Sequence, residues 1–468
     1  MMAKRRISRS VPTLSRLQAH IQRVGIGGPF HDTPRDRQRR ALALQYTQGL
    51  LFPGERKSMQ PMARRVPDAQ YEAIQNFITD SPWDWEETQS RLIDVMKGEV
   101  SGPDGLFVVD DVPLVKQGAM SPGVARQYCG VIGAVDNCQA IVDSIYVLPT
   151  DGLNRETFGW CFALDLYLPK AWADDPARCR EAGIPIPVVF REKWRIALEQ
   201  LDRVRRHALP HQATVADSGY GDCQEFRGQL RAWREPYLVE VTASEVRVIP
   251  AGTPLLEPGG RAPTAEKGRF RVRARLPPGV SAVSPKQLAE EADDWVRVRW
   301  GEGTKGPLEG LFTRRKIRVC RTAQFPTDEV GWLLLEKTPD GLRSWVGWGL
   351  NSRRLEELAA MAHRRFFIER FHEEAKMELG LDPFEGRRWR GLHHHLTLVL
   401  VAHTFLVREQ RRTEGEAPEE PLPTLAEMRR QVVIEVAWAL VSRVALEPRK
   451  EVRIAWATAV AHYWAGAG

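Results

Sequence analysis

The sequence lacks the features that mark membrane proteins and secreted proteins. Its six cysteines form no CxxC pair and no zinc-like spacing with histidine, so we expect neither a zinc module nor a disulfide framework. The longest apolar run, residues 396–407, is too short to cross a bilayer and is interrupted by His403. The basic first ten residues lead into no apolar segment of the kind that a signal peptide contains. We therefore predict a reducing, cytoplasmic location and no membrane partner.

A large excess of one charge is also missing. The formal net charge is +7 over 468 residues, and the contents of 43% hydrophobic and 27% charged residues are ordinary for a folded protein. This length suggests about three domains. The basic residues nevertheless gather in five clusters, at residues 35–40, 56–65, 314–321, 387–390 and 408–412. Such clusters suit a polyanionic partner, although each one alone is more typical of a solvated surface.

The first 95 residues have a helical and basic pattern. The apolar spacing predicts helices over residues 37–51, 69–78 and 86–96, with Asp68 as the N-cap of the second helix. No clear helix-turn-helix pattern is present. We predict a DNA-binding helical domain here, and a domain that only packs against the rest of the chain is the alternative.

Two short apolar runs lead into aspartates. Residues 106–109 precede Asp110 and Asp111, and residues 213–216 precede Asp217. Both runs are typical of buried strands. Turn or cap chemistry, which aspartate favours, is the alternative explanation for each aspartate.

The remaining strand signals form two groups. Residues 138–148 and 160–168 extend the first group into a β-meander, which a helix over residues 190–207 follows. A β-rich segment comes after Asp217, with strands predicted at residues 237–248, 270–276, 295–300, 316–322, 330–337 and 344–348. Most tryptophans of this segment are expected to pack in the core, and one could stack on an unpaired base. They are Trp295, Trp300, Trp332, Trp345 and Trp348.

A third acidic group lies on one amphipathic helix predicted over residues 362–376. At about 100° per residue, a narrow polar stripe collects Arg365, Glu369, His372 and Lys376. The simpler explanation of this stripe is a solvated surface with charge pairs four residues apart. However, three acidic groups on separate elements can hold a pair of hard metal ions.

The C-terminal part begins with three consecutive histidines, residues 393–395. Consecutive helical residues point in different directions and cannot all bind one ion, so phosphate contact or simple polarity is the preferred interpretation. Residues 396–407 are predicted to be a core helix. The polar residues 413–423 are typical of a linker, and residues 424–464 are predicted to form closing helices.

Taken together, these motifs resemble bacterial insertion-sequence transposases of the DDE class, and among them insertion-sequence family 701. The resemblance rests on residues 109–118, on residues 123–130 (Gly-Val-Ala-Arg-Gln-Tyr-Cys-Gly), on residues 216–221 (Ala-Asp-Ser-Gly-Tyr-Gly) and on residues 365–395. It extends over roughly residues 35–410.

The resemblance implies an α/β fold, namely a ribonuclease-H-like catalytic core with a β-rich insertion and helical N- and C-terminal regions. The expected divisions are a helical DNA-binding domain (1–95), the first part of the core (96–234), the insertion (235–352), the second part of the core (353–412), and a linker with helices (413–468).

The resemblance also implies the catalytic residues. Asp111, Asp217 and Glu369 match the three carboxylates of the family, which would hold two Mg²⁺ ions, for which Mn²⁺ can substitute. A valine follows Asp111 where threonine is usual in the family, so Asp110 stays open as the first ligand.

Two basic residues match the Tyr-Arg-Glu-Lys signature of the family. Arg365 and Lys376 have the expected spacing from Glu369 and would bind the DNA phosphate backbone. Ala362 stands at the tyrosine position, so the phosphate contact of a tyrosine hydroxyl is not expected.

The implied function is that of a DNA transposase. Such an enzyme would bind terminal inverted repeats, cleave DNA by two-metal phosphodiester hydrolysis and join the ends to target DNA, with cut-and-paste as the favoured route. We expect a homodimer in the synaptic complex and an association with the bacterial nucleoid. The alternatives are a catalytically inactive DNA-binding relative and a metal-dependent DNA nuclease on the same fold. Buried acidic groups in a basic protein argue against the inactive relative.

Overall fold

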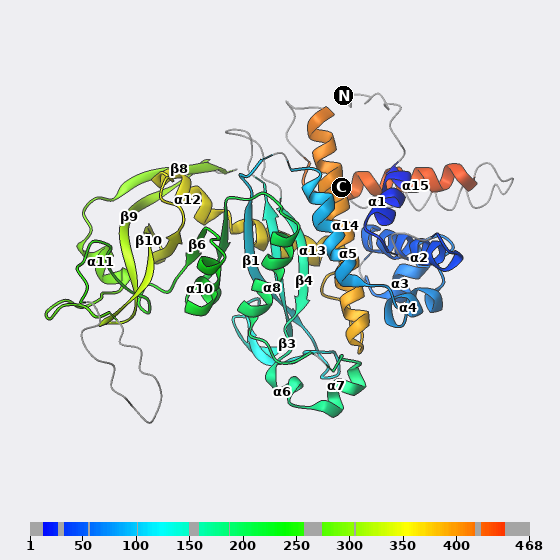
Figure 1. Ribbon diagram of the computed structural model, residues 1–468. Helices are drawn as coiled ribbons and strands as arrows, with labels where there is room; N and C mark the ends of the chain where they lie inside the picture. The colour runs from blue at the N-terminus through cyan, green and yellow to red at the C-terminus, as the bar shows by residue number, and fades with distance from the viewer. Residues whose placement is uncertain are drawn as a thin grey trace.

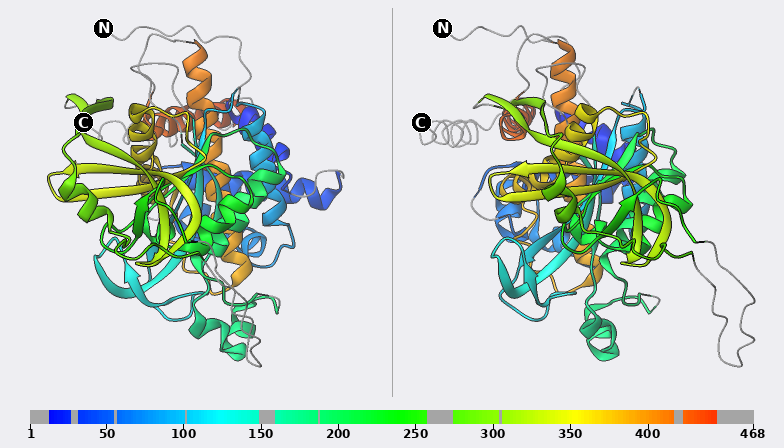
Figure 2. Two further views of the ribbon diagram at one scale, coloured as in Figure 1. Left: turned by 60° about the vertical axis from the view of Figure 1, so that its left-hand side comes forward. Right: turned by 90° about the vertical axis from the view of Figure 1, so that its left-hand side faces the viewer.

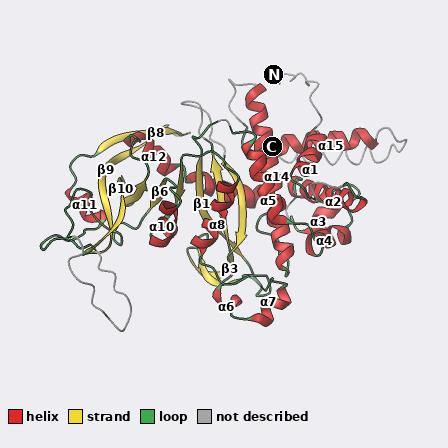
Figure 3. Cartoon of the chain, in the orientation of Figure 1, coloured by secondary structure: helices red, strands yellow, loops and turns green. Residues whose placement is uncertain are grey.

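The computed structural model describes residues 13–26, 32–54, 57–100, 102–148, 159–186, 188–256, 274–303, 306–416 and 423–444. Three parts lie side by side, namely a β-rich lobe, a central sheet with helices on both faces, and a helical part (Figure 1 and Figure 3). In the 90° view of Figure 2 the β-rich lobe lies in front of the central sheet. The expectation of a mixed α/β fold is confirmed.

One mixed sheet of eleven strands runs through the molecule. Its strands are β1 (Leu106–Val115), β2 (Ala125–Cys129), β3 (Ala134–Val147), β4 (Gly159–Leu166), β5 (Ala213–Ala216), β6 (Tyr237–Glu240), β7 (Arg247–Pro250), β8 (Val296–Gly303), β9 (Gly306–Thr322), β10 (Phe325–Thr338) and β11 (Gly341–Trp348). Their order is β2-β3-β1-β5-β6-β11-β10-β9-β7, while β4 pairs with β3 and β8 pairs with β9. Strands β1, β5 and β6 are parallel to one another, and the other pairs are antiparallel.

The first aspartates lie inside a strand and not at its end. The prediction that the strand stops before Asp110 is wrong, because β1 continues to Val115 and stays paired with β3 along its whole length. The apolar residues Val112 and Leu114 alternate with more accessible positions in this second half. Asp217, by contrast, directly follows β5 and caps the short helix α9 (Ser218–Gly221) by accepting a hydrogen bond from the backbone N–H of Tyr220.

Helices cover both faces of the central strands. Helix α8 (Lys193–Arg206) packs on β3 and β1, and helix α13 (Phe366–Leu379) packs on β1, β4 and β3. Smaller helices complete this part, namely α6 (Lys170–Ala173), α7 (Pro176–Ala182) and α10 (Gln224–Ala232). The predicted meander and the predicted helix over residues 190–207 are confirmed.

The β-rich lobe contains β7 to β11 and helix α11 (Pro285–Glu291). The single strand predicted over residues 237–248 is wrong, since a turn at residues 242–245 separates β6 from β7. The strand predicted over residues 270–276 lies mostly outside the described residues. Because β6 and β11 pair directly, the sheet continues from the central strands into the lobe.

The predicted helix over residues 362–376 is two helices. Helix α12 (Leu355–His363) ends before α13 begins at Phe366. Between them, the N–H groups of Arg364, Phe367 and Ile368 each bond to the carbonyl three residues earlier, and this tighter turn interrupts the α-helix.

The helical part is built around one long helix, α14 (Trp389–Glu416). Against it pack α1 (Thr13–Arg23), α2 (Pro34–Leu51), α4 (Tyr71–Thr79), α5 (Trp85–Lys97) and α15 (Leu425–Val444), while α3 (Met59–Arg65) contacts α2 and α4. The core helix predicted over residues 396–407 is confirmed. The predicted linker over residues 413–423 is wrong at its start, since α14 runs to Glu416, and residues 417–422 lie outside the described part.

The N-cap predicted at Asp68 is also wrong. Asp68 has a positive φ of 59°, which belongs to a turn, and Gln70 occupies the N-cap position of α4. Among the residues that the structure describes, no helix has the length and apolarity needed to cross a bilayer.

Candidate active site

Four acidic side chains lie level with one another on one face of the central sheet. Asp110 of β1 pairs with Asp143 of β3. The parallel strands β1, β5 and β6 are paired in register up to the residue before each of the next three acids. Asp110 in β1, Asp217 directly after β5 and Glu240 at the end of β6 therefore lie at the same level. Because paired residues point to the same face, these carboxylates form a row under α13. This acidic row consists of Asp143, Asp110, Asp217 and Glu240, in spatial order.

Cationic side chains face the two ends of the acidic row. His372 of α13 places its Nε2 2.8 Å from Oδ2 of Asp143, whose side chain is fully buried. At the other end, Arg343 of β11 donates two hydrogen bonds to Glu240, of 3.0 and 2.9 Å. The two ends of the row are therefore neutralised from neighbouring elements.

Arg365 occupies the middle of the site. Its Nη1 donates to Oδ2 of Asp110 over 2.7 Å, and its Nη2 donates to Glu369, one turn further along α13. Its positive charge also acts on Asp217, where it partly offsets the rise in pKa that burial causes. One guanidinium thus bridges the sheet and the helix between three carboxylates.

The crowding of acids changes their protonation. Burial raises the pKa of Asp110 to about 7, the charge of Asp217 adds to this rise, and Arg365 opposes it. Burial also raises the pKa of Asp217 and of Asp143 above the ordinary value. Carboxylates held this close and this deep favour a cation among them, because each anion disfavours the charge of the next.

Asp111 faces the other side of the sheet. Successive residues of a strand point to opposite faces, so Asp110 and Asp111 cannot both face α13. The Oδ2 atom of Asp111 lies 2.7 Å from Nζ of Lys193, at the start of α8. The structure therefore brings Asp217, Glu369 and Arg365 together with Asp110. Asp111 lies on the opposite face, although its charge still adds to the raised pKa of Asp217.

Lys376 lies two turns of α13 beyond Glu369. Its Nζ donates to the backbone carbonyl of Pro113 over 3.2 Å, and partial burial lowers its pKa. Lys376 therefore lies against β1 beyond the acidic row, on the same helix as Glu369 and His372.

Three residues of the site were not singled out by the sequence, namely Asp143, Glu240 and Arg343. Asp143 lies inside the apolar strand predicted over residues 138–148, and a lone acid in such a run was the available signal. Glu240 and Arg343 carry no comparable signal, because they meet only when β6 pairs with β11.

The residues of the site suit a hard divalent cation in their chemistry. Asp110, Asp217 and Glu369 offer only oxygen atoms, which Mg²⁺ and Mn²⁺ prefer. Within the described part of the chain, however, no three acidic, histidine or cysteine side chains are grouped as a ready metal site. The bridging position of Arg365 is consistent with this, so the three carboxylates fit a metal only if the guanidinium moves.

The three consecutive histidines contribute nothing to this site. All three are buried in α14, where His394 lies within 3.0 Å of the carbonyl oxygens of Ile78 and Trp83. The Nδ1 of His395 lies 2.8 Å from the hydroxyl of Tyr46. Contact with phosphate, as the sequence suggested, is wrong because the rings are enclosed by the core.

The tryptophans of the β-rich lobe have intramolecular partners. Trp300 stacks on His363 with ring centroids 3.9 Å apart, and Trp348 stacks on Tyr237. Arg314 and Lys316 both lie 4.6 Å from the centre of the Trp332 ring. Lys337 lies over Trp295, and Trp345 is buried. Packing is therefore the observed role of these rings.

Comparison with known proteins identifies the family. The family model "DDE superfamily endonuclease" matches residues 29–307, more than half of the chain, including all the acidic row but not Glu369. A "Probable transposase for insertion sequence element IS701" from Microchaete diplosiphon is 28% identical over 198 residues, 42% of this chain and 47% of that protein. The matched part thus spans about half of that relative's length.

A solved structure also aligns with this chain, at low similarity. A "piggyBac transposase synaptic complex with hairpin DNA" aligns with 96% of this chain and 78% of its own, at 10% identity and a TM-score of 0.40. The family match rests on the sequence of the core, and it confirms the resemblance to DDE-type insertion-sequence transposases. This chain belongs to the DDE superfamily endonuclease family.

Proposed function

We propose that this protein is a DNA transposase that binds terminal inverted repeats, cleaves DNA at their boundary and joins the ends to target DNA by a cut-and-paste route. The observation that carries the proposal is the convergence of Asp110, Asp217 and Glu369 around Arg365, on a chain of the DDE family. A basic protein gains nothing for DNA binding alone from carboxylates buried in this way.

We assign the role of the first carboxylate to Asp110 in place of Asp111. The support is the register of β1, which turns Asp110 toward Asp217 and α13 and turns Asp111 toward Lys193. A metal ligand on the far face of the sheet would need a break in a strand that is regularly paired from Leu106 to Val115.

The three carboxylates would hold two Mg²⁺ ions, for which Mn²⁺ can substitute. When bound, these ions supply activation of the attacking water or 3′-hydroxyl and neutralise charge at the leaving oxygen. The chain itself positions the three carboxylates. Asp110 and Asp217 project from neighbouring parallel strands, and Glu369 projects from α13, which the pair of His372 with Asp143 holds against the sheet.

Arg365 and Lys376 would bind the phosphate backbone next to the scissile bond. Both lie on or at the start of α13, on either side of Glu369. A guanidinium and an ammonium are the side chains that recognise phosphate, the first by two parallel hydrogen bonds.

The helical N-terminal part would bind the DNA repeats. A groove between α2 and α4 is lined by Arg35, Gln38, Arg39 and Asn76, together with Leu42, Ala73, Phe77, Asp80 and Ser81. Arginine and amide side chains are suited to contacts with phosphates and base edges. Residues 1–95 would then act as the DNA-binding domain, ahead of a ribonuclease-H-like core at 96–234 and 353–412, an insertion at 235–352 and a helical end at 413–468.

The active form would be a homodimer that holds two element ends in one synaptic complex, in the cytoplasm and associated with the nucleoid. This expectation comes from the DDE transposases that the sequence resembles.

The test is cleavage of a labelled duplex that carries the terminal repeat of the element, with Mg²⁺ and with a chelator, by the wild type and by Glu369→Gln. We expect metal-dependent cleavage at the repeat boundary that falls below about 1% in the variant, because one metal ligand is lost. Repeat binding should persist in Glu369→Gln, since that side chain holds no phosphate. Specific binding without any cleavage would identify the inactive DNA-binding relative, and cleavage without joining to a target plasmid would identify a nuclease.

A further inference from the structure

Arg365 takes the place that a divalent cation would need. Its Nη1 bonds to Asp110 over 2.7 Å and its Nη2 bonds to Glu369, so the guanidinium fills the space between the sheet carboxylate and the helix carboxylate. Any cation that drew on both of these carboxylates would lie in the same space.

Two cations cannot share this space at low cost. A guanidinium that bonds to a carboxylate occupies lone pairs of the carboxylate oxygens, so fewer are free for a metal ion. The positive charge of the guanidinium also repels a nearby dication. The side chain of Arg365 is only 21% exposed, so water weakens this repulsion less than it would at the surface. The carboxylates therefore have either the guanidinium or a metal ion as their main partner.

Arg365 has a position from which it can change partners. It stands at the N-cap of α13, directly after the tight turn that separates α12 from α13, and so it begins the helix and is not enclosed within it. Glu369, one of its two partners, is 48% exposed and faces solvent. A phosphate that arrived at the exposed side of Glu369 would come within reach of the same guanidinium.

We propose that Arg365 exchanges the carboxylates for a DNA phosphate, so that DNA binding and divalent-cation binding at this site promote each other. The inference rests on the proposed function, since it needs both a metal site at these carboxylates and DNA beside it. In the free protein, Arg365 neutralises Asp110 and Glu369 and keeps metal affinity low. When DNA binds, its phosphate draws the guanidinium away and the carboxylates become free to hold metal.

Linkage makes this coupling measurable from either side. If DNA raises the affinity for the cation by a given factor, the cation must raise the affinity for DNA by the same factor. The structure locates the coupling in one side chain, so removal of the guanidinium should abolish the effect and leave metal affinity high at all times.

The experiment is a titration of Mn²⁺, followed by the electron paramagnetic resonance signal of the free ion. It uses the full chain with and without a duplex that carries the terminal repeat. Duplex alone and the Glu369→Gln protein give the background of Mn²⁺ bound elsewhere. The variants are Arg365→Gln, which removes the charge, and Arg365→Lys, which keeps one charge but cannot bridge two carboxylates. Arg353→Gln is the matched control, because it breaks an arginine–glutamate pair of the same four-residue spacing, with Glu357 of α12, outside the acidic row.

For the wild type we expect weak Mn²⁺ binding that tightens about tenfold when the duplex is added, a factor within the usual range for coupled sites. Arg365→Gln should bind Mn²⁺ about tenfold more tightly than the wild type without DNA and gain nothing from the duplex. Arg365→Lys should fall between these two, and Arg353→Gln should keep the coupling of the wild type. Circular dichroism of each variant establishes that it is folded.

Two results would overturn the inference in distinguishable ways. If the wild type and Arg365→Gln bind Mn²⁺ equally well, or if Arg365→Gln keeps the response to DNA, the metal site stands and Arg365 does not couple it to DNA. If no protein binds Mn²⁺ above the Glu369→Gln background, with or without duplex, the metal site of the proposed function fails and the inference fails with it.

Discussion

Asp110 and Asp111 are neighbours in the sequence, yet they face opposite sides of the sheet. Asp110 bonds to Arg365 under α13, and Asp111 bonds to Lys193 of α8. In the sequence the family pattern favours Asp111 and leaves Asp110 open, because the same apolar run precedes both residues. They differ because successive side chains of β1 point to opposite faces of the sheet. The pairing of β1 with β3 and β5 decides which face each aspartate takes.

The two aspartates should therefore respond differently to substitution. Asp110→Asn should reduce metal-dependent cleavage of the repeat duplex to below about 1% of the wild-type rate, because it removes a ligand charge. Asp111→Asn loses only a partly exposed ion pair with Lys193, worth about 1 kcal/mol or less, and should leave the rate within about tenfold of the wild type. Single-turnover cleavage of both variants at equal protein concentration checks this. The reverse order of effects would show that Asp111, and not Asp110, is the first metal ligand.

Part of the site could be predicted from single residues. Asp217, Glu369 and Arg365 were singled out by their patterns, and the structure gathers them around one guanidinium. Asp143 carried only the signal of a lone acid in an apolar run, and Glu240 carried none, because a row across four strands is a property of tertiary pairing that no local window contains.

At the scale of elements, buried lysines from other parts of the chain hold the C-terminal end of α13 and the loop that follows it. The C-terminal end of α13 receives Lys57, whose buried Nζ donates to the carbonyls of Phe52 and Glu378 over 3.0 and 2.9 Å and also to Leu50. Lys116, just after β1, holds the next loop by donating to the carbonyls of Asp382 and Phe384, both over 2.7 Å. The helix itself ends at Gly380, whose left-handed backbone forms the C-cap, and Lys57 supplies a donor for the carbonyl of Glu378 in the last turn.

Histidines buried on and around α14 make the helical part sensitive to acid. Burial lowers the pKa of His403 and of His395 to about 3, and burial together with Arg408 lowers the pKa of His20 to about 3. In the unfolded chain these rings return to their ordinary pKa near 6.5. Below pH 6.5 the unfolded state therefore binds more protons than the folded state. The contribution of these neutral histidines to the free energy of unfolding is fully present above pH 6.5 and is lost as the pH falls toward 3.

His403→Leu should make the stability of the protein less dependent on pH. His403 packs edge-on against Phe371 of α13 in an apolar environment, so leucine fits the site without adding a charge. One such histidine lowers the free energy of unfolding by about 1.4 kcal/mol for each pH unit below pH 6.5. In the variant the free energy of unfolding should fall less steeply by that amount. Chemical denaturation at pH 7.5, 6.0 and 5.0 measures the two slopes. Equal slopes for the wild type and the variant would show that His403 does not titrate on unfolding.

Most elements could be predicted from local patterns, and the errors have specific physical causes. Strands β8, β10 and β11, the last part of β9 and the helices α2, α5, α8 and α14 follow from apolar spacing. The break between α12 and α13 has no proline or glycine to announce it, because it is made by backbone bonds of three-residue spacing. The turn between β6 and β7 is likewise hidden, since residues 242–245 interrupt an apolar run without any glycine or proline.

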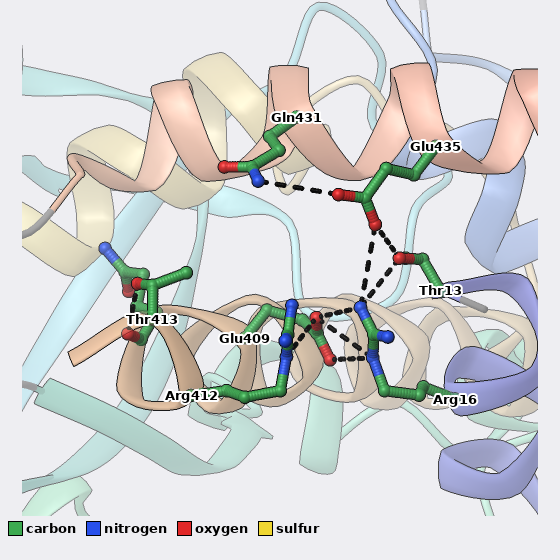
Figure 4. A network of polar contacts seen from close by, with 8 residues as sticks. Thr13, Arg16, Glu409, Arg412, Thr413, Gln431 and Glu435 are labelled. Carbon is green, nitrogen blue, oxygen red and sulfur yellow. Dashed lines mark hydrogen bonds and ion pairs between the residues drawn. The ribbon is translucent and has the colours of Figure 1, made fainter. Parts of the chain in front are cut away.

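At the scale of the whole molecule, the two ends of the described chain meet in one polar network. Glu409 of α14 accepts hydrogen bonds from Arg16 of α1, at 2.9 and 2.6 Å, and one from Arg412 at 3.3 Å (Figure 4). Glu435 of α15 joins through Thr13 and through Arg16 at 3.6 Å. The first and last described helices are thus held to the same side of α14.

Glu409→Gln should loosen both of these helices. The side chain of Glu409 is only 6% exposed, so removing its charge leaves partly buried guanidiniums with poorer partners, at a cost of about 1–3 kcal/mol. Hydrogen exchange followed by mass spectrometry should show faster exchange in α1 and α15 and no change in the β-rich lobe. Glu309→Gln is the matched control, since it breaks the exposed pair with Arg297 and should cost almost nothing. Unchanged exchange in α1 and α15 would show that apolar packing alone holds them.

The position of α14 in the chain has a consequence for how the protein is made. Helices α2, α4 and α5 are complete by Lys97, but the helix that they pack against begins only at Trp389. A ribosome adds roughly 5–20 residues per second, so on the order of tens of seconds pass between the emergence of the two partners. Throughout that time the surface of these helices that faces α14 stays uncovered, although the helices already contact one another and α5 already has β4 as a partner. The nascent chain therefore exposes apolar surface both on its earliest helices and on β4 until α14 has been synthesised.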